Sequence, residues 1–127
     1  MVAEISQIRK QSEMSVALNE LKITEGVIAV ALVGRDGFVI ESTASSALDM
    51  EALGAMVATA IGTTESLGME FELGAMDQYL AEFQGGKVLM AAVHADILAV
   101  VTEASAVIGA VRYAMRKHIP SVLKAML

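Results

Sequence analysis

The sequence predicts a single α+β domain, a three-layer sandwich in which one central helix covers one face of an antiparallel sheet and the terminal helices cover the other. The stretch Gly26–Val33 is apolar at both parities, which is typical of a strand buried on both sides. Gly34-Arg35-Asp36-Gly37 follows it, and Asp-Gly is a strong signal for an antiparallel hairpin with residues 38–42. The segment 49–69 has helical periodicity and carries no charge between Glu51 and Glu65.

The composition indicates a soluble protein with more apolar surface than one small core can hide. The 127 residues are 55% hydrophobic, with a mean hydropathy of +0.59. The longest apolar run, Val88–Val101, is interrupted by His94 and Asp96 and is shorter than the roughly 20 residues of a spanning helix. Charges within the first ten residues are not typical of a signal peptide. We therefore expect a cytoplasmic oligomer.

Two further counts exclude classes of function. A net charge of −6 argues against nucleic acid as a partner. The absence of cysteine excludes a disulfide framework and thiolate ligands for zinc.

The first expected element is a helix within Met1–Leu21, capped by Ser12 or starting earlier, near Ser6. Its buried face comprises Met14, Ala17, Leu18 and Leu21. We expect one domain over 1–127, with a core of about 12–119 and a flexible segment at 1–11.

The central helix, capped by Asp49 or Ser46, has no side suited to water. A stripe at helical spacing is expected to face its own sheet: Met50, Leu53, Val57 and Ile61. Two ridges of small residues are expected to face a second copy of the chain: Gly54, Ala58 and Gly62, and beside them Ala55, Thr59 and Thr63.

Three antiparallel strands are expected next, at 76–83, 87–93 and 97–102, the first at a sheet edge or subunit boundary. The last helix is expected to begin at Ser105 and to close at His118, with Pro120 starting a short final turn. Its buried face comprises Val107, Ile108, Val111, Ala114 and Met115. The order of elements is α-β-β-α-β-β-β-α.

Catalytic motifs are missing from this chain. It has no phosphate-binding loop and no dinucleotide fingerprint, so we expect no enzyme activity, no cofactor and no metal site. His94 and His118 are interpreted as structural. Arg35 lies on a tight turn, where it is either solvated or available to a partner's phosphoryl-transfer site. All charges after Glu103 are positive. These residues either stabilise the C-terminal end of the helix dipole or form a docking face for an acidic partner.

Several local sequences, in this order and spacing, resemble the roadblock/dynein light chain family and its bacterial Mgl-type B members. The matching segments are Gly26-Val27, residues 36–40 (Asp-Gly-Phe-Val-Ile), residues 53–56 (Leu-Gly-Ala-Met), residues 85–89 (Gly-Gly-Lys-Val-Leu), residues 98–101 (Leu-Ala-Val-Val) and residues 108–112 (Ile-Gly-Ala-Val-Arg). The resemblance runs from about Met14 to Ile119 and implies a roadblock/profilin-like fold.

The resemblance also implies a homodimer in which central helices pack together and third strands pair. Its interface would comprise Gly54, Ala55, Ala58, Thr59, Gly62, Thr63, Tyr79, Ala81 and Phe83. Family members of this prokaryotic, single-domain kind bind Ras-like small GTPases as regulators, including GTPase-activating partners, or as scaffolds. Candidate partner contacts are Arg35, Arg112 and Arg116.

Two alternatives to a GTPase regulator remain open. One is a small-molecule sensor with a cavity lined by Met56, Phe71 and Met90. The other is a dimer that only tethers other proteins.

Overall fold

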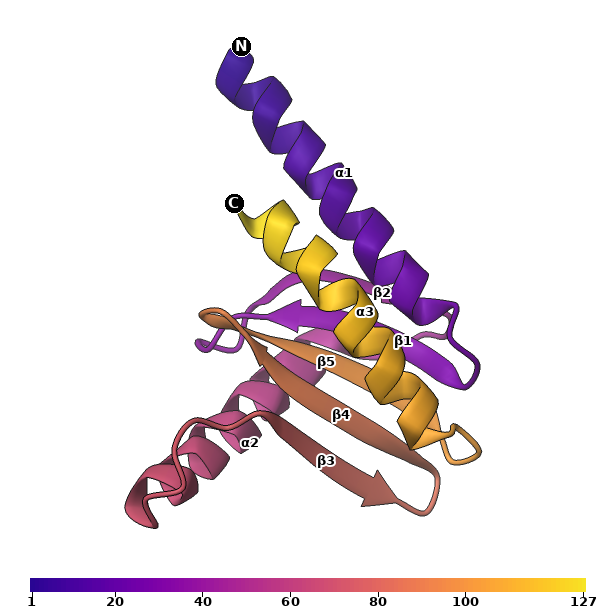
Figure 1. Ribbon diagram of the computed structural model, residues 1–127. Coiled ribbons are helices and arrows are strands. Elements are labelled where there is room, and N and C mark those ends of the chain that lie inside the picture. The colour runs from indigo at the N-terminus through magenta and orange to yellow at the C-terminus, as the bar shows by residue number, and fades with distance from the viewer.

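The computed structural model describes all residues 1–127, and its elements follow the predicted order. The elements are α1 (Val2–Lys22), β1 (Val27–Val33), β2 (Val39–Ala44), α2 (Met50–Glu70), β3 (Gln78–Phe83), β4 (Gly86–Val93), β5 (Asp96–Glu103) and α3 (Ile108–Met126). The strands form one antiparallel sheet in the order β2-β1-β5-β4-β3. Helix α2 lies on one face, and α1 and α3 lie side by side on the other (Figure 1). The predicted three-layer sandwich is confirmed.

The core has two layers, one on each face of the sheet. The larger layer joins the sheet to α1 and α3, and the smaller layer joins it to α2. Strand β1 serves both, because its side chains alternate. Val30 and Leu32 belong to the first layer, whereas Ala31 and Val33 belong to the second. The prediction that this strand is buried on both sides is confirmed.

The first hairpin closes as the Asp-Gly signal predicts. The Gly34 N–H donates to the Phe38 carbonyl oxygen at 2.8 Å, and the Gly37 N–H donates to that of Gly34 at 2.9 Å. Gly37 has φ +92°, a conformation that favours glycine. Asp36 contributes differently, because its carboxylate accepts the Phe38 N–H at 3.1 Å.

Helix α1 begins at Val2, earlier than either predicted start. Its buried residues are the four that were predicted: Met14, Ala17, Leu18 and Leu21. The first turns of α1 extend past the sheet and past the end of α3 (Figure 1), whereas Lys10 and Gln11 still line a hollow with the sheet and the end of α3. Contact with the sheet therefore does not set the start of this helix.

Helix α3 differs from its prediction at both ends. It begins at Ile108, and Val107 is an exposed N-cap residue rather than part of the buried face. It also continues through Pro120, although proline removes one helical hydrogen bond. Val122 and Ala125 are buried in the core beyond that proline, so packing holds the last turns in place.

None of the three helices combines the length and apolar content that crossing a membrane requires.

Candidate protein-interaction site

Helix α2 has a buried side that matches the predicted stripe. It begins at Met50, where the Asp49 carboxylate accepts the Ala52 N–H at 3.0 Å as an N-cap. Val57 and Ile61 are buried against the sheet, and Met50 and Leu53 pack beside them. This side therefore faces the chain's own sheet, as predicted.

The opposite side of α2 is exposed and carries no charge across three turns. Its exposed positions are Ala55, Met56, Thr59, Gly62 and Thr63. A Cβ placed on Gly62 would meet no atom within 4 Å, so nothing in the chain covers this position.

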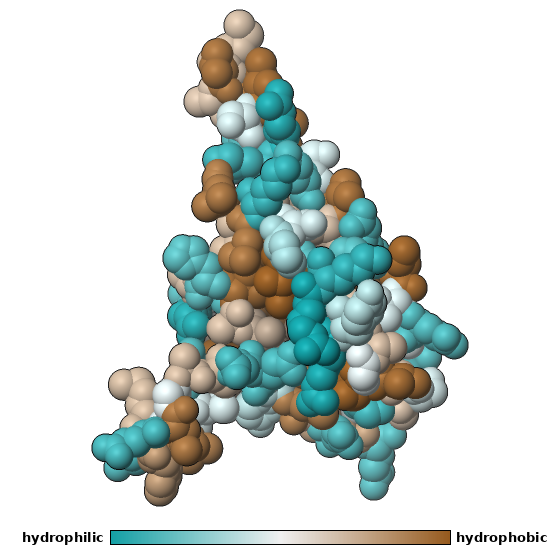
Figure 2. Space-filling model, viewed as in Figure 1, coloured by the Kyte–Doolittle hydropathy of each residue, from teal (hydrophilic) through white to brown (hydrophobic).

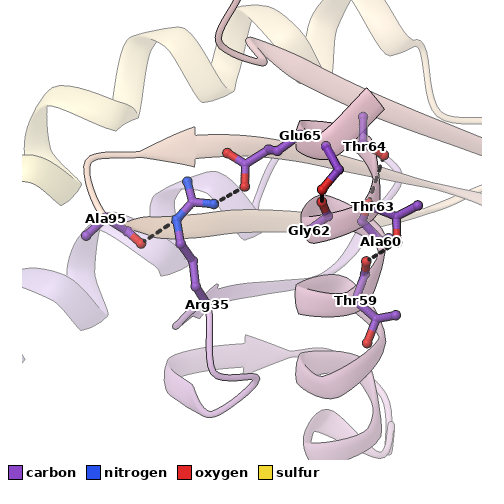
Figure 3. Close-up of polar contacts among 9 residues, drawn as sticks. Arg35, Thr59, Ala60, Gly62, Thr63, Thr64, Glu65 and Ala95 are labelled. Atoms are coloured by element: carbon purple, nitrogen blue, oxygen red, sulfur yellow. Dashed lines mark hydrogen bonds and ion pairs between the residues drawn. The ribbon is translucent and has the colours of Figure 1, made fainter. Parts of the chain in front are cut away.

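Hydroxyl groups on α2 are satisfied within the helix. Thr59 donates to the Ala55 carbonyl oxygen at 2.9 Å. Thr63 donates to the Thr59 carbonyl oxygen at 3.0 Å (Figure 3). Thr64 and Ser66 donate in the same way to Ala60 and Gly62. A group that already has a hydrogen-bond partner costs less to remove from water. The exposed side is therefore suited to being covered by another apolar surface.

Gly54 lies elsewhere than the predicted interface. It is buried, and a Cβ there would stand 2.6 Å from the Gly37 carbonyl oxygen and 2.9 Å from Val39 Cγ2. Its lack of a side chain lets α2 approach the first hairpin closely. Ala58 is half-buried, and its Cβ lies 3.9 Å from the position of a Cβ on Gly37.

The sheet beside α2 carries an incompletely covered apolar surface. Helix α2 lies mainly over β1, β2 and β5. On the same face, the other strands carry part-buried or exposed residues, among them Tyr79, Ala81, Phe83 and Val88. A shallow groove of about 480 Å³ runs between α2 and β3, from Ala55 and Met56 to Tyr79. We call the exposed side of α2, this groove and these strand residues the α2–β3 surface.

Two more features extend this surface. Strand β3 ends the sheet, so its outer edge has no partner within the chain. The far end of α2 projects past the sheet and carries both apolar and polar residues (Figures 1 and 2). Leu67, Met69, Phe71 and Leu73 are exposed there. The sequence analysis did not predict this exposed apolar segment. The pattern that could have indicated it is an apolar residue at every second position from 67 to 73, with Glu70 and Glu72 between them.

Arg35 is held by its own chain. Its Nε donates to the Ala95 carbonyl oxygen at 2.9 Å, and its Nη1 pairs with the Glu65 carboxylate of α2 (Figure 3). The side chain therefore joins the first hairpin, α2 and the β4–β5 turn. It neither projects from the turn nor is simply solvated.

The three candidate partner arginines do not share one surface. Arg112 and Arg116 lie one turn apart on α3, on the face of the sheet opposite α2 and Arg35. Arg112 Nε donates to Gln78 Oε1 of β3 at 3.0 Å. One flat partner surface would not reach both groups.

The structure has no cavity lined jointly by Met56, Phe71 and Met90, the lining expected for a small-molecule sensor. Met90 is buried in the core layer under α2, whereas Met56 and Phe71 are exposed. These three side chains therefore do not enclose a common space. The histidines are also apart: His94 lies in the β4–β5 turn, and His118 Nδ1 lies 3.2 Å from Glu20 Oε2 of α1.

Comparison with known proteins agrees with this architecture. The chain is 37% identical over 109 residues to the Methanocaldococcus jannaschii protein MJ0310, covering 86% of this chain and 95% of that one. The structure of Myxococcus xanthus MglB has the same fold, with a TM-score of 0.85, 18% identity and coverage of 91% and 89%. A Roadblock/LC7 domain from Streptomyces avermitilis also matches, with a TM-score of 0.81, 17% identity and coverage of 88% and 96%.

The model of the Roadblock/LC7 domain matches residues 15–103, which include every strand and the whole of α2. The expected family resemblance is confirmed: this chain belongs to the Roadblock/LC7 domain family.

Proposed function

We propose that the chain forms a homodimer through the α2–β3 surface, and that the dimer binds a Ras-like small GTPase as its regulator or scaffold in the cytoplasm. The observation that carries the dimer is the uncharged side of α2 beside an uncovered part of the sheet. Exposed apolar patches of this kind are typical of protein interfaces.

The open edge of β3 supports a continuous sheet across the dimer. Both α2 helices can lie on the same face of the joint sheet only if the twofold axis between the two β3 strands passes through a pair of equivalent residues. An axis that passed between two successive residues would put the helices on opposite faces, because side chains alternate between faces along a strand. With Ala81 opposite Ala81 of the second copy, Tyr79 of each copy would lie opposite Phe83 of the other. Cross-strand aromatic pairs stabilise antiparallel sheets.

Ala55, Thr59, Gly62 and Thr63 would then face the equivalent helix of the second copy. Their small size permits close approach of two helices, and the bound hydroxyls leave no donor stranded. Gly54 takes no part in this contact, since it is buried in its own chain.

Family membership and the shared MglB fold support the GTPase as partner. The chain would act on the GTPase's own residues, or hold it in place, rather than contribute a catalytic group. The contacts of Arg35 agree with that role, because a guanidinium tied to Glu65 and Ala95 is not free to enter another protein's site.

The test is a pull-down of small GTPases from the source cell in both nucleotide states, followed by single-turnover hydrolysis with and without the protein. Recovery of a GTPase supports the proposal, and acceleration distinguishes a regulator from a scaffold. Recovery of other proteins alone would favour the tethering alternative. A stable monomer in sedimentation would refute the dimer independently of the partner.

A further inference from the structure

Helix α1 has two apolar stripes that face different directions. The core stripe occupies its second half, at Met14, Ala17, Leu18 and Leu21. A second stripe comprises the N-cap residue Met1 and, in the first half of the helix, Ile5 and Ile8. At about 100° per residue, the two stripes point roughly 160° apart.

The second stripe is open to solvent. Ile5 is 52% exposed and Ile8 65% exposed. They lie in the first half of α1, whose free end shows apolar residues between polar ones (Figure 2). The positions that continue the core stripe here are polar instead, namely Gln7, Lys10 and Gln11. These polar side chains line a hollow with the sheet and the end of α3, so no apolar contact holds this half of α1 on its own sheet.

We propose that the first half of α1 pairs in parallel with the same segment of a second copy. Met1, Ile5, Ile8 and Ser12 are spaced by four, three and four residues, which is the spacing of a coiled-coil seam. Ser12, the last of these four residues, is polar. A single polar residue in a coiled-coil seam can select the register of the two helices.

The flanking charges favour the parallel orientation. Glu4 precedes the seam residue Ile5, and Arg9 follows the seam residue Ile8. In a parallel pair, such flanking positions meet across the interface when they are five residues apart. Glu4 of each copy would therefore meet Arg9 of the other, giving two opposite-charge contacts.

The position of the body permits this pairing. The sheet lies on the side of α1 that carries the core stripe. Since the second stripe faces nearly the opposite way, the two bodies of a parallel pair would lie outward and would not collide. The contact is isologous, with its own twofold axis. With the α2–β3 contact on the other face of the sheet, it would link dimers into tetramers or longer chains.

The seam covers only a few turns, so the pair is expected to be weak and to need high concentration. Light scattering from micromolar to millimolar protein should show the average mass rising about twofold or more. Ile5→Glu with Ile8→Glu should abolish the rise. The matched control is Gln7→Glu with Gln11→Glu, which adds the same charge to the same turns on another side and should leave the rise in place. All four side chains are exposed, so folding is not at stake.

A second experiment reports orientation. The chain has no cysteine, so Ser12→Cys introduces a unique thiol. A parallel pair in register would bring two such thiols within disulfide distance. Oxidation should then cross-link Ser12→Cys, whereas the control Gln7→Cys, on another side of α1, should cross-link far less.

Cross-linking does not require the α2–β3 dimer, so failure of that contact would leave this readout intact. Constant mass in the wild-type protein, or equal cross-linking of the two cysteine variants, would overturn the proposal. A third outcome would also overturn it: Ile5→Glu/Ile8→Glu loses binding to a GTPase or to anionic lipid vesicles, while its mass stays that of the wild type. Another partner would then occupy the stripe.

Discussion

Replacing Phe83 by alanine tests the proposed dimer at one side chain. Phe83 ends β3, is 66% exposed in the single chain and would be covered in the dimer opposite Tyr79 of the second copy. Fully burying such a side chain contributes about 1.5–3 kcal/mol, so covering two thirds of it contributes about 1–2 kcal/mol. Each dimer holds two copies, which gives a loss of about 2–4 kcal/mol and a rise in the dimer Kd of roughly 30- to 1,000-fold.

The assay is sedimentation equilibrium over a dilution series, with Tyr113→Ala as the control. Tyr113 is also aromatic and 65% exposed, but it lies on α3, on the other face of the sheet. Both substitutions remove exposed surface, so the fold should persist in each. An unchanged dimer Kd for Phe83→Ala, or an equal change for Tyr113→Ala, would refute the placement of the interface.

Alanine at two of the three glycines of α2 should have different effects in urea unfolding. Gly54→Ala should cost about 1–3 kcal/mol by overpacking against the hairpin. Gly62→Ala meets open space and should not destabilise the single chain, so equal losses would contradict this packing. Asp49→Ala removes the N-cap and should lower the free energy of unfolding by about 1 kcal/mol. Arg35→Ala breaks the partly exposed pair with Glu65 and should cost at most about 1 kcal/mol. It should leave any acceleration of GTP hydrolysis intact; a loss near 10³-fold in single-turnover assays would instead identify a catalytic arginine.

Local patterns predicted most of the fold correctly. The Asp-Gly turn and the apolar strand before it act over a few residues, so neighbouring sequence is enough to specify them. The core stripe of α1 and the Asp49 cap are also local features, set by helical spacing and by one hydrogen bond.

The errors lie where contacts distant in sequence decide. Pro120 looked like a helix end, yet burial of Val122 and Ala125 carries α3 past it. Gly54 looked like a neighbour of Gly62 on one ridge, yet the hairpin lies against Gly54 and leaves Gly62 open. Arg35 looked free, yet α2 and the β4–β5 turn bring partners 30 and 60 residues away.

The sequence by itself determined the order of elements, the family and the absence of charge along α2, because these depend on residue type and spacing. Only the tertiary structure decided which part of that uncharged helix remains uncovered. Helix α2 lies over one half of the sheet, so Ala55 and Thr59 stay exposed along a groove that reaches Tyr79. Burial is a property of two surfaces in contact, and periodicity along one helix specifies only one of them.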